Sequence, residues 1–237
     1  MKVTVFNGSP RAERGNTHIM VEEFKKGAQK AGAEVENVFL VKKEINFCRG
    51  CFSCWGTSGT CAIIDDMRGL LKKFIESDIV VFATPVYVDN VTGVMKQFMD
   101  RLIPLVDPHM DRDEKGETVH RKRFLEYPKI VVISNCGFPE QSHFQVFPLL
   151  FERVARNLHS EVVAEIYRGG GELLRLDHPQ LMAVISDYKE LLQKAGREVV
   201  EMLGLSEETK SALENPLVPH DMYRENVNRG YDAVLSR

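Results

Sequence analysis

Short, uninterrupted apolar runs alternate along the chain with longer stretches that have a helical spacing of apolar residues. The run Ile79-Val-Val-Phe-Ala and the run Ile130-Val-Val-Ile contain no polar residue, as expected for strands buried on both faces of a sheet. In chain order, the pattern predicts strands at 3–7, 34–40, 79–83, 130–134 and 162–166 and helices at about 17–31, 66–76, 92–103, 144–158 and 179–203.

Five strands that alternate with five helices indicate an α/β fold, in which helices cover both faces of a parallel sheet. The chain has 237 residues, which is enough for one large domain with a substantial core. It contains no internal repeat and no low-complexity segment. We assign residues 1–205 to this domain and residues 206–237 to a C-terminal tail that packs on the surface or on a partner subunit.

The first predicted strand runs into a loop rich in glycine and small polar residues, and the first helix follows. Backbone N–H groups at a helix start lack partners within the helix and carry partial positive charge, so they favour a phosphate. Ser9 and Thr17 add hydroxyl groups, Asn16 adds an amide, and Arg11 adds a full charge. The alternative is an ordinary turn capped by Asn16 or Thr17. The loop lacks the motifs of dinucleotide-binding and Walker-type turns.

Gly-Ser-Pro-Arg followed by Gly-Asn-Thr resembles the phosphate loop of the flavodoxin-like flavin reductases, where it wraps the phosphate of FMN. The segment after the third predicted strand, with Pro85, Val86 and Tyr87, is similar to the isoalloxazine loop of the NAD(P)H-dependent FMN reductase family. Tyr87 offers a flat face to an aromatic ring, and the alternative is a turn in which Tyr87 covers the core. The resemblance extends to Asp100 and Arg101, for which we expect a structural role.

The resemblance implies a flavodoxin-like fold, that is, a doubly wound five-stranded parallel sheet of order 2-1-3-4-5 with helices on both faces. In such sheets, ligands bind outside the carboxyl ends of the strands where the strand order reverses. The loops after strands one, three and four should therefore converge, which adds Asn135, Gly137 and Phe138 to the predicted FMN site. Gly137 permits close backbone approach, and Phe138 covers an edge of the ring. Cys136 is expected to be a buried apolar side chain.

Four of the five cysteines, Cys48, Cys51, Cys54 and Cys61, have the spacing C-x2-C-x2-C-x6-C. Bacterial ferredoxins use the first spacings for a cubane cluster, whereas structural zinc sites usually pair two separated knuckles. The motif resembles that of the iron–sulfur flavoproteins, which implies that these cysteines bind a [4Fe–4S] cluster. Zinc, and free or oxidised thiols that line the flavin pocket and touch a neighbouring subunit, remain alternatives. Trp55 is expected over the cluster or the flavin, or in loop packing.

The net charge is −3 and basic residues are interspersed with acidic ones, so nothing points to nucleic acid or to an anionic membrane surface. No apolar run approaches the roughly 20 residues needed to span a bilayer. The first residues enter a strand without a signal peptide, and crowded cysteines suit a reducing compartment. We therefore expect a cytoplasmic protein. We expect the polar segment 107–127 to be an insertion that serves as a lid or a subunit contact.

The resemblance implies an FMN-dependent oxidoreductase. It would pass electrons from NAD(P)H or another donor to a quinone, a nitro or azo compound, a flavin or a protein acceptor, with or without the cluster. Because FMN carries this chemistry, no side chain is assigned a catalytic role. The resemblance also implies a homodimer or homotetramer with flavin sites near subunit boundaries. The alternative is a flavodoxin-like electron carrier or a thiol redox sensor without intrinsic turnover.

Overall fold

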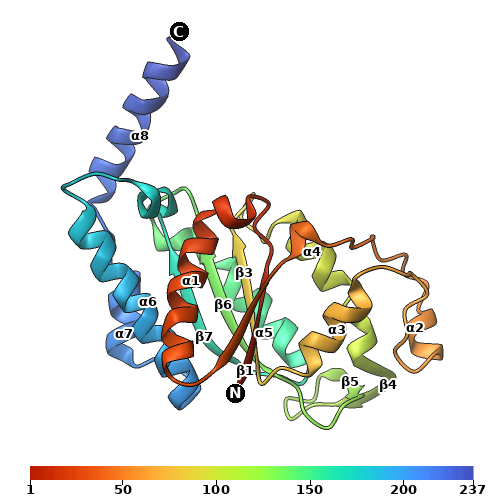
Figure 1. Ribbon diagram of the computed structural model, residues 1–237. Helices are drawn as coiled ribbons and strands as arrows, with labels where there is room; N and C mark the ends of the chain where they lie inside the picture. Colours follow the sequence, from red (N-terminus) through yellow and green to blue (C-terminus); the bar gives the residue numbers. More distant parts are fainter. Residues whose placement is uncertain (237) are drawn as a thin grey trace.

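Five parallel strands form the central sheet of the computed structural model, which describes residues 1–236 (Figure 1). The order in the sheet is β2-β1-β3-β6-β7, and every neighbouring pair is parallel. Counted along the chain, this is the predicted order 2-1-3-4-5, so the doubly wound flavodoxin-like fold is confirmed. The strands are β1 (Lys2–Asn7), β2 (Glu34–Phe39), β3 (Ile79–Pro85), β6 (Lys129–Asn135) and β7 (Val162–Arg168).

Helices cover both faces of this sheet (Figure 1). The five predicted helices are α1 (Asn16–Lys30), α3 (Met67–Ile75), α4 (Gly93–Asp100), α5 (Val146–Asn157) and α6 (Met182–Met202). On one face, α1 and α6 contribute Phe24 and Leu192 to a core that includes Val81 of β3. On the other face, α3, α4 and α5 enclose a core that includes Phe74 and Phe82. Burial between two helical layers explains the uninterrupted apolar runs of β3 and β6.

Single turns complete the connections between these elements. The helix expected at 92–103 is shorter than predicted, because α4 ends at Asp100 and a 3₁₀ turn with Pro104 follows. The short segments are η1 (Ala12–Arg14), η2 (Leu40–Lys42), η3 (Ile103–Leu105), η4 (Gln141–Phe144), η5 (Gly171–Arg175) and the one-turn helix α2 (Ser53–Gly56).

The polar segment 107–127 contains a β-hairpin. Its antiparallel strands, β4 (Val106–Arg112) and β5 (Thr118–Lys122), form a separate two-stranded sheet. Arg156 of α5 donates a 2.7 Å hydrogen bond to Asp113 in the hairpin turn. The sequence pattern predicts no strand here, because most of the hairpin side chains are polar and exposed. A role as a lid or subunit contact stays a prediction.

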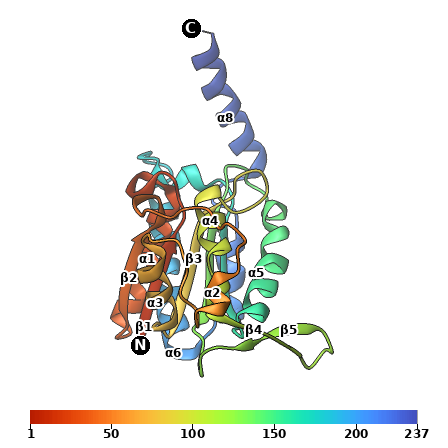
Figure 2. The same ribbon diagram turned by 90° about the vertical axis from the view of Figure 1, so that its right-hand side faces the viewer.

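The C-terminal tail contains two helices, α7 (Glu207–Glu214) and α8 (His220–Leu235). α7 packs against α6 and β7, whereas α8 projects from the body at the opposite end from the hairpin (Figure 2). The expectation that no helix follows residue 203 is therefore wrong. The pattern is weak because Tyr223 is the one buried residue of α8. Contact of the tail with a partner subunit stays a prediction. Across residues 1–236, none of the helices combines the length and the apolar character needed to cross a membrane.

Candidate functional site

The loops after β1, β3 and β6 meet at the carboxyl end of the sheet. Pro85, at the end of β3, pairs with Asn135, at the end of β6. Val86 N donates to Asn135 O at 2.8 Å, and Asn135 Nδ2 donates to Thr17 Oγ1 at 2.7 Å. One amide side chain therefore connects the third loop to the start of α1, as expected for loops at a switch point.

The first turn of α1 presents buried polar groups to this region. Ser9, Asn16 and Thr17 are 2%, 5% and 1% exposed. The N-cap is Gly15, so the alternative in which Asn16 or Thr17 caps the helix is wrong. Asn16 Oδ1 and Asn7 Nδ2 are buried and find no hydrogen-bond partner among residues 1–236. An acceptor and a donor without partners, beside an uncapped helix start, fit a ligand that carries both hydroxyl and phosphate groups, as FMN does.

A carboxylate lies against the predicted phosphate ligands. Arg11 Nη2 donates to Glu172 Oε1 at 2.8 Å. Burial raises the pKa of Glu172, but hydrogen bonds from Arg11 and Asn16 outweigh burial and hold the pKa below its ordinary value. The contact with Arg11 shows that this end of the site can hold an anion. Sequence reasoning missed Glu172, although the run Gly-Gly-Gly-Glu after the last strand is a signal of close backbone approach.

Tyr87 connects the second loop to the first. Its side chain is 45% exposed, so the alternative in which Tyr87 covers the core is wrong. The turn from Tyr87 to Asn90 closes through reciprocal backbone hydrogen bonds of 2.9 and 3.2 Å. A hydrogen bond with Tyr87 also contributes, after the larger effect of Glu172, to the raised pKa of Arg11. An exposed aromatic ring therefore lies beside the charged end of the anion site.

The loop after β6 combines an exposed ring with a braced backbone. Phe138 is 63% exposed, and Gly137 O accepts a 2.7 Å hydrogen bond from Tyr223 of α8. Cys136 is 6% exposed, and burial raises the pKa of its thiol to about 11. The expectation that Cys136 is buried is therefore confirmed.

The four clustered cysteines have different surroundings. Cys48 and Cys51 are exposed, Cys54 is buried and Cys61 is partly buried, and all are free thiols. Burial, with a smaller effect of Cys61, raises the pKa of Cys54, whereas a hydrogen bond with Ser53 lowers that of Cys51. In the part of the chain that the structure describes, no three Cys, His, Asp or Glu side chains gather at metal-binding distances. As placed, these thiols therefore do not fit a [4Fe–4S] cluster or a zinc ion.

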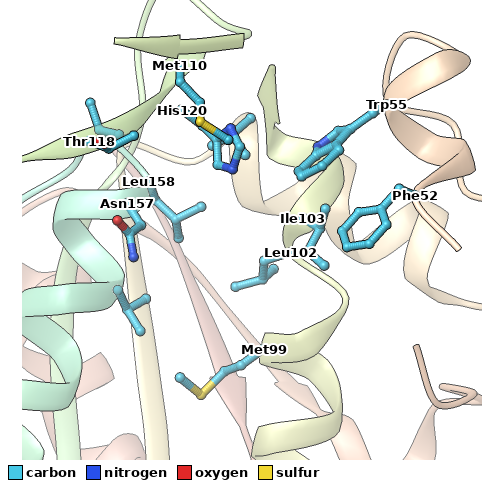
Figure 3. A pocket seen from close by; sticks show the side chains of 13 residues that line it. Phe52, Trp55, Met99, Leu102, Ile103, Met110, Thr118, His120, Asn157 and Leu158 are labelled. Carbon is cyan, nitrogen blue, oxygen red and sulfur yellow. The ribbon is translucent and has the colours of Figure 1, made fainter. Parts of the chain in front are cut away.

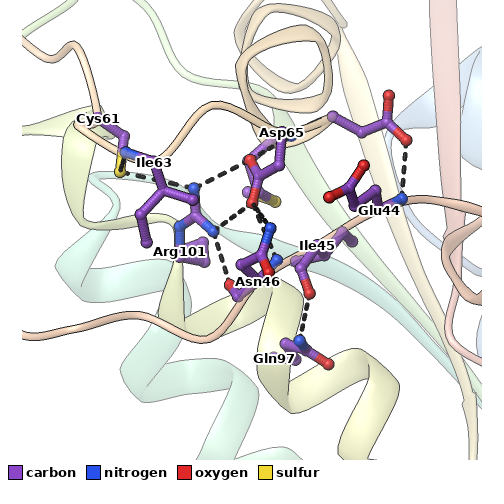
Figure 4. Close-up of polar contacts among 10 residues, drawn as sticks. Glu44, Ile45, Asn46, Cys61, Ile63, Asp65, Gln97 and Arg101 are labelled. Atoms are coloured by element: carbon purple, nitrogen blue, oxygen red, sulfur yellow. Dashed lines mark hydrogen bonds and ion pairs between the residues drawn. The ribbon is translucent and has the colours of Figure 1, made fainter.

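A buried ion pair fixes the end of the cysteine segment to α4 (Figure 4). The side chains of Arg101 and Asp65 are 2% and 0% exposed. Arg101 donates to both oxygens of Asp65, at 2.7 and 3.1 Å, and to Asn46 O at 2.6 Å. Its Nη2 also lies 3.5 Å from Cys61 Sγ. Arg101 therefore has the structural role that was expected for it.

Trp55 packs against the hairpin. Its ring stacks on Phe52 with 4.7 Å between centroids and lies 4.9 Å from the ring of His120 in β5. α2, which carries Trp55, accordingly lies beside β4 and β5 and away from the carboxyl ends of the parallel strands (Figure 1). Of the positions expected for Trp55, loop packing is the one observed.

Comparisons with known proteins show which family shares these features. The model of the family "NADPH-dependent FMN reductase" matches residues 1–122. Iron-sulfur flavoprotein MJ1083 of Methanocaldococcus jannaschii is 43% identical over 119 residues, which are 50% of this chain and 61% of that protein. An iron-sulfur flavoprotein of Archaeoglobus fulgidus is 43% identical over 104 residues, 44% of this chain and 46% of that protein. The chain thus matches about half the length of these relatives.

Two further kinds of relative cover more of the chain. YwqN of Bacillus subtilis, described as an NAD(P)H-dependent FMN-containing oxidoreductase, is 32% identical over 188 residues, 77% of this chain and 94% of that protein. The structure of an FMN-dependent NADH-azoreductase from Bacillus anthracis aligns with a TM-score of 0.62 at 15% identity, over 84% of this chain and 99% of that one. That similarity shows the fold alone. The family match and the YwqN alignment together show that this chain belongs to the NADPH-dependent FMN reductase family.

Proposed function

We propose that this chain is an FMN-dependent oxidoreductase that accepts electrons from NAD(P)H and passes them to a quinone, an azo or nitro compound, a flavin or a protein acceptor. The observation that carries the proposal is the anion site at the start of α1, where Arg11 already holds a carboxylate. An exposed tyrosine ring lies beside it. A phosphate site next to an aromatic face has the chemistry needed to hold a flavin mononucleotide.

The residues divide between the two ends of this ligand. Those at the start of α1 bind the phosphate, and those of the second and third loops bind the ring. The phosphate ligands are Ser9, Arg11, Asn16 and Thr17, and the ring contacts are Pro85, Val86, Tyr87, Asn135, Gly137 and Phe138.

When bound, FMN supplies the hydride and electron chemistry. The chain positions it through backbone and side-chain hydrogen bonds and offers buried donors that need little reorganisation. The turn at Tyr87 and the loop at Phe138 present exposed rings beside the site, where a nicotinamide or a flat acceptor can stack. The names of relatives, an azoreductase and an FMN-containing oxidoreductase among them, support this class of donor and acceptor.

Equilibrium binding of FMN and of riboflavin tests the proposal. Both ligands carry the same ring, but riboflavin lacks the phosphate, so FMN should bind at least tenfold more tightly. Flavin fluorescence and the visible spectrum of the purified protein measure binding. Oxidation of NADH or NADPH with a quinone then separates an enzyme from an electron carrier, which would turn over slowly without a reductase. A protein that binds neither flavin contradicts the proposal.

The [4Fe–4S] cluster is a separate proposal with its own support. The spacing of Cys48, Cys51, Cys54 and Cys61 and the names of the iron–sulfur flavoprotein relatives favour it. Because the thiols do not converge in this structure, the segment would have to rearrange around the cluster. Iron and acid-labile sulfide analysis of anaerobically purified protein is the test. Fully titratable thiols without iron contradict the cluster and leave the FMN proposal intact.

A further inference from the structure

We infer that the cavity enclosed by α2, the β4–β5 hairpin and the ends of α4 and α5 is a second ligand site, for an uncharged planar aromatic molecule that carries a hydrogen-bond acceptor. Its volume is about 530 Å³, within the range of small-molecule sites. Figure 3 shows Trp55 and Phe52 on one side, Met99 and Leu102 at the base, and Asn157 opposite. The inference does not rest on the proposed flavin function, but it applies to the chain without a cluster, because a cluster would rearrange the segment that carries Phe52 and Trp55.

The cavity offers flat aromatic surfaces. Phe52 and Trp55 are stacked at an interplanar angle of 24°, and the His120 ring is tilted by 51° to Trp55. Phe52 has a left-handed backbone, with φ of 54°, which is a strained conformation for a bulky residue. It is also 53% exposed, so burial of its ring does not offset this strain. A planar ligand that covers Phe52 would explain why the segment holds the ring there.

One polar group in the cavity lacks a partner. Trp55 Nε1 is buried and meets no hydrogen-bond acceptor among residues 1–236. A buried N–H without an acceptor is unfavourable, and buried indole groups usually find one. In Figure 3 the indole nitrogen lies on the side of the ring toward His120. His120 Nδ1 lies 3.2 Å from Pro108 O. The other ring nitrogen of His120, Nε2, is left available to hydrogen-bond a ligand. Because the indole nitrogen is covered in the ligand-free chain, a carbonyl oxygen of a ligand would satisfy it after a small shift of the Trp55 ring.

The uncharged lining indicates an uncharged ligand. None of the 13 lining residues is Asp, Glu, Lys or Arg, so a charged ligand would lose its hydration without compensation.

The cavity lies at the other end of α4 from the phosphate loop. Thr92, at the start of α4, donates to Gly8 O in the phosphate loop at 2.7 Å. Met99 and Leu102 line the cavity at the other end of this helix, about 10 Å further along its axis.

Two naphthalene derivatives test the inference on the full chain saturated with FMN. 2-Acetylnaphthalene carries the carbonyl acceptor, and 2-isopropenylnaphthalene has nearly the same shape without it. Trp55 is the only tryptophan, so its indole N–H gives one resonance in a ¹H–¹⁵N spectrum. We expect the ketone to move this proton downfield and to bind about two- to tenfold more tightly than the alkene, as one hydrogen bond of typical strength allows. Should FMN not bind, the same titration on the flavin-free chain still tests the cavity.

Two substitutions in α5 provide a matched pair. Val154→Phe fills the cavity and should weaken ketone binding at least tenfold, whereas Val146→Phe, on an exposed part of the same helix, should leave it unchanged. Amide resonances far from the cavity confirm that both variants fold. The inference is overturned if neither probe shifts the Trp55 resonance in the unsubstituted chain. It is also overturned if that resonance moves on protein dilution without a probe, since a second copy would then occupy the cavity.

Discussion

Glu172 and Arg11 form their ion pair across 161 residues of sequence, and no spacing rule connects such distant positions. The structure brings them together because Gly170 adopts a left-handed φ of 62° and Gly171 packs closely on the third loop. A Cβ atom at Gly171 would lie 2.7 Å from Asn135 Oδ1. The run of glycines is visible in the sequence. The contact that it allows between Glu172 and Arg11 could not be predicted from the sequence.

Glu172→Gln should tighten FMN binding. In the flavin-free chain the Glu172 carboxylate competes with the phosphate for Arg11 and Asn16, and as a like charge it would repel a bound phosphate. The expected gain is about two- to fivefold, because the exposed ion pair is worth only about 0.5–1 kcal/mol. Flavin fluorescence titrations measure it. Glu13→Gln is the control, since Glu13 pairs with Lys42. Weaker binding by Glu172→Gln would show that Glu172 orients Arg11 instead.

Arg11→Ala should weaken FMN binding by roughly 1.5–3 kcal/mol, the contribution of a charge-assisted hydrogen bond. Riboflavin binding should not change, because riboflavin lacks the phosphate. Arg14→Ala is the matched control, since Arg14 is an exposed arginine on the adjacent turn. Equal FMN affinity for Arg11→Ala and the unsubstituted chain would place Arg11 outside the phosphate site.

Asp65→Asn should destabilise the attachment of the cysteine segment by about 3–5 kcal/mol, because Arg101 would stay buried without its counter-charge. Limited proteolysis and amide hydrogen exchange of residues 44–66 measure the loss. Asp66→Asn is the control, because Asp66 accepts only an exposed hydrogen bond from Glu44 N. Equal protection in the two variants would contradict the importance of the ion pair.

The same pair predicts how stability depends on pH. Burial alone would raise the pKa of Asp65, but the hydrogen bond from Arg101 and those from the backbone lower it below the ordinary value. An unfolded aspartate has a pKa of about 4, so Asp65 stabilises the fold above that pH. This contribution is lost as the pH falls through the depressed native pKa. Urea unfolding of Asp65→Asn should therefore lack part of the acid dependence of the unsubstituted chain.

At the scale of elements, the sequence pattern predicts the buried strands and helices and misses the exposed ones. The central strands β3 and β6 have helices on both faces, so their apolar runs are continuous and easily read. β5 buries only Val119, and α8 buries only Tyr223, so the apolar pattern of each element is too sparse to indicate a packed element. The predicted phosphate loop is local in sequence, whereas the hairpin cavity is lined by residues of α2, α4, η3, β4, β5 and α5.

The crossing of α1 and α6 depends on two glycines. A Cβ atom at Gly27 would lie 1.8 Å from Gln193 O, and one at Gly196 would lie 2.0 Å from Phe24 O. Because these neighbours are backbone atoms, Gly196→Ala must push the helices apart and should cost about 1–3 kcal/mol or more. Urea unfolding measures the change. Gly69→Ala in α3, with no atom within 4 Å, should instead stabilise by about 0.5–1 kcal/mol. Equal effects would contradict close packing at the crossing.

At the scale of the whole molecule, the two ends of the sheet carry different chemistry. The carboxyl end holds the anion site and the base of α8, and the other end holds the hairpin, α2 and the aromatic cavity (Figure 2). Tyr223 joins α8 to the loop after β6 through a hydrogen bond to Gly137 O. Beyond Tyr223 the helix projects with most side chains exposed, including Tyr231 at 64% and Val234 at 65%. A helix of this length is marginal in water unless its apolar face is covered.

The resemblance implies a homodimer or homotetramer, and we predict that a second copy of the chain covers this helix. Val227, Tyr231 and Val234 follow Tyr223 at helical spacing, so they form one apolar stripe. Changing both Tyr231 and Val234 to Glu should therefore lower the sedimentation coefficient to that of a smaller species. Arg229→Glu, on the opposite side of α8, should leave sedimentation unchanged. Neither change reaches the base of the helix, so FMN affinity should stay within twofold. A larger change in affinity would indicate that the stripe packs beside the partner's flavin site. Identical sedimentation of all three proteins would contradict a role for α8 in assembly.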